Sequence, residues 1–343
     1  MAAAAKAARQ SIFLLEVVQL SLIVQKFGGS SVRDMEHLLR MAHIAKERYE
    51  DGNDVVVVLS AQGDTTDTLL EKARELTPAP DRRELDMLLS AGEQVSAALG
   101  ALALQTLGVN AVSLCAWQIP IETNSAHGDA QIEMVDAARI RRELDAGRIV
   151  VVTGFQGLDE KGDITTLGRG GSDTSAVALA AALSADELTI YTDVDGIFSS
   201  DPRICPDAVR RERISYDDML LLAQKGAQVL HDRSVALAQA SGVPITVKSC
   251  ETGSRGSIVC ERGDVSQVVG VTQKTSDTSQ LAAITAVGDA LPSVEHERAV
   301  VSALERGGVN VYAIAGGERF LSVYVLRADA DRALRLAHSA LIR

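Results

Sequence analysis

A lysine followed by glycines lies at a point where a predicted strand changes into a helix. The segment KFGGSS, residues 26–31, ends the apolar run Leu22–Phe27, and a helical pattern follows directly. Glycines let backbone N–H groups approach a ligand, a helix N-terminus favours an anion, and Lys26 adds a point charge suited to phosphate. The sequence therefore predicts a phosphate-binding loop; a tight turn with an exposed lysine is the alternative. A Walker A loop is excluded because the lysine precedes the glycines.

A second glycine-rich segment, TLGRGGSD at residues 166–173, opens an alanine-rich helical pattern. Ser172 or Asp173 is the expected helix cap. Arg169 at the mouth of the helix is suited to a carboxylate, and Asp173 one turn on could take an ammonium group. Together they would bind the head group of an amino acid; a capping Asp173 and a solvated Arg169 are the alternative. A Rossmann site is excluded, since Asp173 stands where the third glycine of GxGxxG belongs.

Further polar residues follow predicted strands. Residues 191–203 begin at a strand end, where open α/β sheets bind ligands, so Thr192 and Asp193 could meet a ribose or adenine and Arg203 a phosphate. Simple turns at Asp-Gly and Asp-Pro are the alternative. Polar clusters at residues 60–67 and 154–157 are less specific.

Three other polar residues have ordinary explanations. Glu93 lies in a helical pattern beside a glycine, where a solvated glutamate is the usual reading. His127 and His231 have no partners at metal-ligand spacing, so a structural role is expected for both.

Short apolar runs alternate with helical patterns along the first three quarters of the chain. The predicted strands are residues 22–27, 55–59, 149–152 and 188–191. Continuous apolar runs are typical of strands buried on both faces, which indicates an α/β fold with a mostly parallel sheet. The expected helices lie between the first two strands and at 81–104, 135–144, 174–183, 219–223 and 234–240. Hairpins are expected over 157–165 and 251–258.

The residues after Cys260 predict a small α+β unit. The expected order is strand, strand, helix, strand, strand, helix, at residues 268–272, 281–287, 294–306, 309–314, 321–326 and 329–341. The expected domains are an N-terminal extension over 1–21, a main domain over 22–262 and the small unit over 263–343. The apolar run 11–24 is interrupted by Glu16 and Gln19 and has no cleavage site, which disfavours a signal peptide.

Composition limits the class of protein. The 343 residues fit one large and one small domain, and 46% apolar with 23% charged residues indicates a globular fold. A net charge of −12 repels polyanions, so no nucleic-acid or anionic-membrane partner is expected. Four scattered cysteines suggest neither a zinc cluster nor a disulfide framework, which favours a reducing, cytoplasmic location.

Five segments in one order, KFGGSS, SAQGDTTD, SAGE, TLGRGGSD and TDVDGIFSSDPR, resemble the aspartate kinases of the amino acid kinase superfamily. The resemblance extends from about Leu22 to Cys260. It implies an αβα sandwich and the reaction of ATP with L-aspartate to give ADP and 4-phospho-L-aspartate, the first step towards lysine, threonine and methionine. It also implies Mg²⁺ accompanying the nucleotide, with no metal site assigned to protein residues.

The resemblance assigns roles by position to three groups of residues. The group at the transferring phosphoryl is Lys26, Gly28, Gly29 and Asp173. The aspartate pocket would contain Ser30, Thr66, Glu93, Phe155, Arg169, Gly170, Gly171 and Ser172. The nucleotide site would be lined by Thr192, Asp193, Phe198, Arg203, Gln228 and Val229. An aspartate carboxylate is ionised near neutral pH, so positioning and charge neutralisation would carry the catalysis without a general base.

The tail resembles an ACT unit, which binds amino-acid effectors and pairs edge to edge in this family. A homodimer and an amino-acid effector are therefore expected. Aspartate kinases usually carry two ACT units, whereas this tail has room for one, so lysine or threonine feedback is an open question. Gln228 replaces a lysine usual near the nucleotide, and Lys225 is a cation that could compensate. The alternatives are a related kinase for another carboxylate and a non-catalytic amino-acid sensor.

Overall fold

The four predicted strands form the centre of an eight-stranded sheet. The computed structural model describes residues 21–264, 268–276 and 278–342, so residues 1–20 of the expected extension lie outside the described residues. The central strands are β1 (Leu22–Phe27), β2 (Asp54–Leu59), β6 (Ile149–Thr153) and β9 (Glu187–Thr192), parallel in the order β9-β1-β2-β6. The outer strands are β3 (Ala111–Leu114), β10 (Arg213–Ser215), β11 (Ile245–Ser249) and β12 (Ser257–Cys260). Because only the β11–β12 pair is antiparallel, the predicted α/β class is confirmed.

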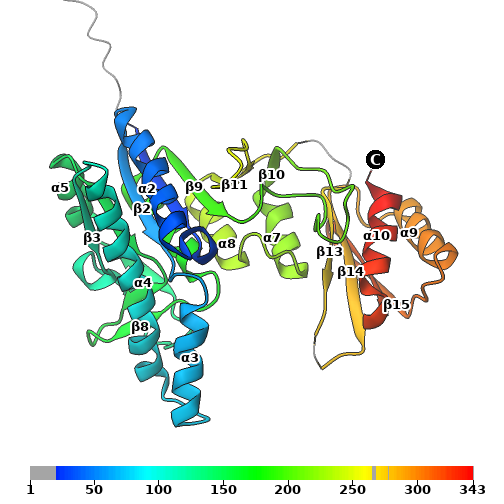
Figure 1. The fold of residues 1–343 in the computed structure, drawn as a ribbon. Coiled ribbons are helices and arrows are strands. Elements are labelled where there is room, and N and C mark those ends of the chain that lie inside the picture. Colours follow the sequence, from blue (N-terminus) through cyan, green and yellow to red (C-terminus); the bar gives the residue numbers. More distant parts are fainter. Residues whose placement is uncertain (1–20, 265–267, 277, 343) are drawn as a thin grey trace, which may run out of the picture.

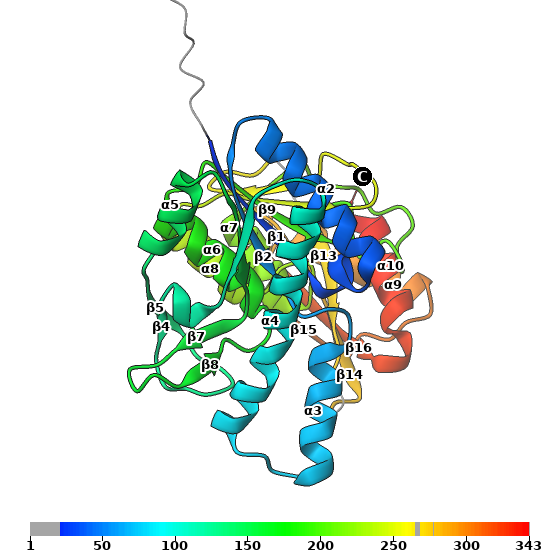
Figure 2. The ribbon, with the colours of Figure 1, turned by 60° about the vertical axis from the view of Figure 1, so that its left-hand side comes forward.

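Helices cover both faces of this sheet and give three layers (Figure 2). One face packs against α2 (Met35–Glu50) and α4 (Arg82–Thr106). The other packs against α5 (Ala138–Asp145), α6 (Gly171–Leu183), α7 (Tyr216–Lys225) and α8 (Asp232–Ser241). By length and composition α4 could cross a membrane, but 56% of its apolar window is buried, as in a core helix.

Several elements of the first unit were not predicted or begin at another residue than expected. The helix α3 (Thr65–Leu76) stands out from the body of the molecule with most of its last turns exposed, and no helix was expected there, although Leu69, Ala73 and Leu76 have helical spacing. The expected helix over 135–144 begins only at Ala138, because Val135 ends a strand, β5 (Ile132–Val135), that pairs with Ile121. This strand belongs to a small sheet, β5-β4-β7-β8, with β4 (Ile121–Thr123), β7 (Gln156–Leu158) and β8 (Ile164–Thr166).

The C-terminal residues form a second unit with the predicted order of elements. Its members are β13 (Gly270–Lys274), β14 (Leu281–Val287), α9 (Val294–Arg306), β15 (Ala313–Gly317), β16 (Phe320–Leu326) and α10 (Ala330–Leu341). The antiparallel sheet has the order β13-β14-β16-β15, and both helices pack on it around one apolar core, as in an ACT-like domain. The third strand begins later than predicted, because Val309 is buried and its N–H bonds Leu304 O at the end of α9. The domain boundary at 262/263 stays a prediction.

Helix α7 connects the two units (Figure 1). Arg319, in the turn between β15 and β16, pairs with the buried Asp218 of α7 at 2.8 Å. Lys225, at the end of α7, lies 3.8 Å from the centre of the Phe320 ring. Lys225 is the cation that could compensate for Gln228 at the nucleotide site. In the structure its ammonium group contacts the C-terminal unit instead.

Replacing Arg319 with alanine is expected to destabilise the protein, because it leaves the buried Asp218 carboxylate with Ser215 as its remaining side-chain partner. Loss of a hydrogen bond to a charged group costs about 1.5–3 kcal/mol. Urea unfolding measures this loss. Arg298→Ala, on an exposed position of α9, is the matched control. Equal unfolding midpoints for the two variants would contradict the expectation.

Candidate active site

The segments predicted to carry chemistry meet at one edge of the central sheet. Backbone hydrogen bonds continue past the ends of the four parallel strands: Gly28 N to Tyr191 O at 3.2 Å, Ser60 N to Phe27 O at 3.2 Å and Gly154 N to Leu59 O at 2.9 Å. The loops after β1, β2, β6 and β9 therefore lie side by side. This is the carboxyl edge at which open α/β sheets bind ligands.

Lys26 is fixed by an ion pair at this edge. Its Nζ lies 2.6 Å from Asp173 Oδ1, and the two side chains are 10% and 12% exposed. Asp173 belongs to the first turn of α6, whose cap is Gly170, so the expectation of Ser172 or Asp173 as the cap is wrong. Asp173 was expected to bind the ammonium group of a ligand; in the structure it pairs with the ammonium group of Lys26. A Cβ atom at Gly28 would lie 3.5 Å from Nζ, so a larger residue there would cover what remains accessible of the ammonium group.

Two glycines are required by close approaches at this edge. A Cβ atom at Gly29 would lie 2.8 Å from Ala61 O, in the loop after β2. Gly170 has φ +68°, and a Cβ atom there would lie 2.2 Å from His231 Cβ. Any larger residue at either position would separate the loops that form the site.

Glu93 is buried, which makes the expectation of a solvated glutamate wrong. Its side chain extends from α4 towards the loop after β2, where Oε1 accepts a hydrogen bond from Ala61 N at 3.0 Å. The other oxygen, Oε2, is buried without a hydrogen-bond partner among the described residues. Burial raises the pKa of Glu93 to about 7, and the bond from Ala61 N–H opposes this rise. The free oxygen is suited to a cationic ligand group.

Arg169 is exposed and lines a cavity of about 550 Å³ beside the loop after β8. Cationic and imidazole side chains dominate its lining: Arg82, His127, Arg169, His231 and Arg233, with Asp129 as the acidic member. The sequence predicts structural roles, and not metal ligation, for His127 and His231; in the structure both side chains line this cavity. Its charge suits an anionic ligand.

Comparison with known proteins shows the family to which the chain belongs. The chain matches the amino acid kinase family over residues 21–249. It is 48% identical to the aspartokinase of Geobacillus stearothermophilus over 294 residues, 85% of this chain and 71% of that protein. The chain belongs to the aspartokinases of the amino acid kinase family. It is therefore a kinase, a phosphotransferase.

Solved aspartokinases share the fold. The aspartate kinase from Synechocystis is 31% identical and superposes with a TM-score of 0.65 over 94% of this chain and 69% of that chain. For E. coli aspartokinase III in complex with aspartate and ADP, the TM-score is 0.82 at 23% identity, over 94% of this chain and all of that chain. The present aspartokinase spans 60% and 57% of the Bacillus sp. and Mycolicibacterium smegmatis aspartokinases.

The residues expected in the aspartate pocket lie around the same edge. Phe155, after β6, has φ +68°, and its N–H bonds Ser175 Oγ at 3.0 Å. Its ring lies against Gly171, and Ser172 is buried against Gly154. Thr66 is half-buried in the first turn of α3, and Ser30 is exposed after β1. The structure thus brings Phe155, Gly171 and Ser172 together at the start of α6.

The residues expected at the nucleotide are more widely spread. Thr192 and Asp193 stand at the end of β9, where Thr192 Oγ1 donates to Asp193 Oδ1 at 3.0 Å. Phe198 lies further along and pairs through its backbone with Arg210. Arg203 is 78% exposed and pairs with Asp201 at 2.7 Å. The fifth and sixth members, in the loop between α7 and α8, are the exposed Gln228 and the half-buried Val229.

Aspartate binding is expected to depend on the protonation of Glu93. Below pH 7 the buried carboxyl of the free enzyme is protonated and cannot pair with a substrate ammonium group, so kcat/KM for aspartate should fall about tenfold per pH unit. The folded protein binds the proton of Glu93 more tightly than the unfolded chain does, because the pKa of Glu93 is raised above its ordinary value of 4.5. Protonated Glu93 therefore adds to the free energy of unfolding in full below pH 4.5, and this contribution is lost as the pH rises through 7. A pH profile of kcat/KM tests this, and Glu93→Gln should remove the inflection. A flat wild-type profile between about pH 6 and 8 would contradict the expectation.

Proposed function

We propose that this aspartokinase transfers the γ-phosphoryl group of ATP to the side-chain carboxylate of L-aspartate, giving ADP and 4-phospho-L-aspartate. The observation that carries the proposal is the ion pair of Lys26 with Asp173 at the carboxyl edge of the sheet. Arg169 lies four residues before Asp173 and lines the cavity, and Glu93, with one oxygen free of hydrogen-bond partners among the described residues, bonds the loop after β2. Lys26, Arg169 and Glu93 match, in turn, a phosphoryl group, a carboxylate and an ammonium group.

Lys26 is the proposed contact of the transferring phosphoryl group, with the backbone of Gly28 and Gly29 beside it. Asp173 orients the ammonium group through its 2.6 Å ion pair. The aspartate carboxylate is already ionised and attacks the γ-phosphorus; the new O–P bond forms as the bond to the bridging oxygen of ADP breaks. Positive charge at Lys26 and the N-terminus of α6 offset charge on the transferring oxygens.

The head group of aspartate is proposed to lie between Arg169, which takes the α-carboxylate, and Glu93, which takes the α-ammonium group. The remaining pocket residues are Ser30, Thr66, Phe155, Gly170, Gly171 and Ser172. The proposed nucleotide residues are Thr192, Asp193, Phe198, Arg203, Gln228 and Val229.

Magnesium would enter with the nucleotide. Mg²⁺ usually keeps several waters and binds substrate phosphates with one or two carboxylates. The Asp173 carboxylate is engaged by Lys26, whereas Asp193 is exposed at the strand end and carries a carboxylate suited to this role. When bound, the ion neutralises phosphate charge. These residues fit an ion held mainly by the phosphates.

The wider setting is also a proposal. We propose a cytoplasmic enzyme of lysine, threonine and methionine synthesis that forms a homodimer through its C-terminal unit and binds an amino-acid effector. One solved E. coli aspartokinase III is a complex with lysine and aspartate. Strand β15, exposed over most of its length at the edge of its sheet, supports pairing with a second copy.

Trapping the acyl phosphate with hydroxylamine tests the reaction directly. Aspartate hydroxamate should form from L-aspartate and MgATP, and not with glutamate, N-acetylglutamate or no amino acid. A non-catalytic sensor is the second candidate, because Gln228 offers no charge and Lys225 contacts Phe320. Folded protein that yields no hydroxamate, yet is stabilised by an amino acid without MgATP in a thermal-shift titration, would favour the sensor.

A further inference from the structure

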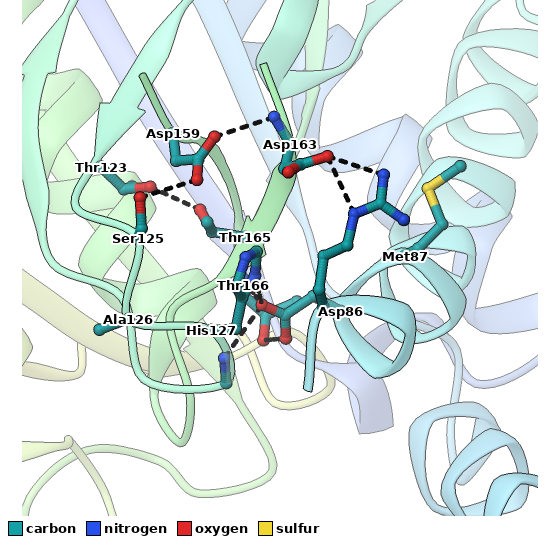
Figure 3. A network of polar contacts seen from close by, with 12 residues as sticks. Asp86, Met87, Thr123, Ser125, Ala126, His127, Asp159, Asp163, Thr165 and Thr166 are labelled. Carbon is teal, nitrogen blue, oxygen red and sulfur yellow. Dashed lines mark hydrogen bonds and ion pairs between the residues drawn. The ribbon is translucent and has the colours of Figure 1, made fainter. Parts of the chain in front are cut away.

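A buried carboxylate of α4 joins the two segments that line the cavity beside Arg169. Asp86 is 1% exposed. Its Oδ2 lies within hydrogen-bond distance of Thr166 N at 3.1 Å, Gly128 N at 3.0 Å and His127 Nδ1 at 2.9 Å, and Oδ1 accepts from Thr166 Oγ1 at 2.5 Å. Figure 3 shows His127 and Thr166 directed at Asp86.

These bonds fix the backbone that leads to Arg169. Residues 166–168 and 127–130 are further joined by a hydrogen bond from Ala130 N to Thr166 O at 3.0 Å. Gly168 is so close to the second segment that a Cβ atom would lie 3.0 Å from Asp129 Oδ1. Arg233, near the start of α8, joins the same two segments, since it pairs with Asp129 at 2.6 Å and donates a hydrogen bond to Leu167 O at 3.2 Å.

Asp86 and Glu93 lie seven residues apart on α4, which places them on one face of the helix. Their carboxylates have different partners. Glu93 keeps one oxygen free, whereas both oxygens of Asp86 already accept hydrogen bonds from the protein. Asp86 is therefore suited to hold a loop and not to bind a substrate.

We propose that Asp86 is a positioning residue that sets the place of Arg169 relative to Glu93. Helix α4 carries one receptor of the amino acid, Glu93, and through Asp86 it fixes the loop that carries the other. This inference rests on the proposed function, because it assigns these two side chains to the two charged groups of aspartate. Loss of the Asp86 bonds should then impair aspartate binding more than phosphoryl transfer.

The test compares two neighbouring threonines. Thr166→Val removes the hydroxyl that bonds Asp86, and Thr165→Val removes an equally buried hydroxyl that bonds Thr123 Oγ1 at 2.5 Å (Figure 3). Asp86→Asn is the third variant. We expect Thr166→Val and Asp86→Asn to raise KM for aspartate about tenfold, with kcat and KM for ATP changed less than about twofold. Thr165→Val should leave all three constants near the wild-type values.

Hydrogen exchange of the peptide over residues 167–173 gives a readout that does not need turnover. Exchange should be faster in Thr166→Val and Asp86→Asn than in Thr165→Val and wild type. Unchanged exchange in both variants, or equal effects of the two threonine substitutions on KM, would overturn the proposal. If the wild-type enzyme makes no aspartate hydroxamate, the proposed function fails, and the exchange comparison alone decides whether Asp86 fixes the loop.

Discussion

Lys26→Ala should lower kcat for aspartate phosphorylation by about 10²- to 10³-fold, the usual cost of removing one preorganised group that stabilises transition-state charge. The ammonium group is nearly buried, and Gly28 leaves it accessible from the strand end. Because the contact is made to the transferring group, KM for aspartate should change little. A coupled ADP-release assay under saturating substrates measures the effect.

Lys46→Ala is the control for removing a lysine. Lys46 pairs with Glu50 on α2, away from the strand ends. The Lys26 variant also leaves Asp173 without its ion-pair partner, so its circular dichroism and unfolding midpoint should be recorded to show that it folds. A folded Lys26→Ala protein whose kcat lies within about threefold of wild type would remove this residue from the phosphoryl site.

Arg169→Ala should raise KM for aspartate roughly 10- to 100-fold while kcat at saturation falls far less. A hydrogen bond to a charged group contributes about 1.5–3 kcal/mol, and 1.4 kcal/mol corresponds to tenfold in affinity. Arg169 is exposed on the cavity, so its loss should not disturb the core. Steady-state kinetics over a wide range of aspartate concentrations separate the two constants.

Arg142→Ala is the matched control, since Arg142 is exposed on α5 and no residue of this helix lines the cavity. Arg169→Lys adds a second comparison, because a lysine keeps the charge but loses the paired donors of the guanidinium. Partial recovery of KM in Arg169→Lys would support a carboxylate ligand. An unchanged KM in Arg169→Ala would show that the α-carboxylate binds elsewhere.

Much of the fold follows from local patterns in the sequence. The run Val55–Leu59 has no polar residue and is rich in valine, which is typical of a strand covered on both faces. In contrast, α3 is not among the predicted helices although Leu69, Ala73 and Leu76 have helical spacing, and β5 is a partly exposed strand that is held by its pairing with β4. Elements held by tertiary contacts leave little trace in a single sequence.

The site divides in the same way. Lys26 and Arg169 could be singled out because glycines and a helix start surround each of them in the sequence. For Glu93 the local pattern predicts a solvated side chain and only the resemblance points to the pocket, since its burial results from the approach of Ala61 from another loop. Asp86 was missed for the same reason, although its spacing of seven residues from Glu93 places both carboxylates on one helix face.

The position of β1 also constrains the order in which this enzyme can fold. β1 pairs with β2, the next strand in sequence, and with β9, where Gln25 Nε2 bonds Tyr191 Oη 166 residues later in the chain. Non-local strand pairing is slow because a long loop must close first. During synthesis Lys26 can therefore reach its final surroundings only after β9 has left the ribosome, so nascent chains that end before residue 187 should bind no nucleotide.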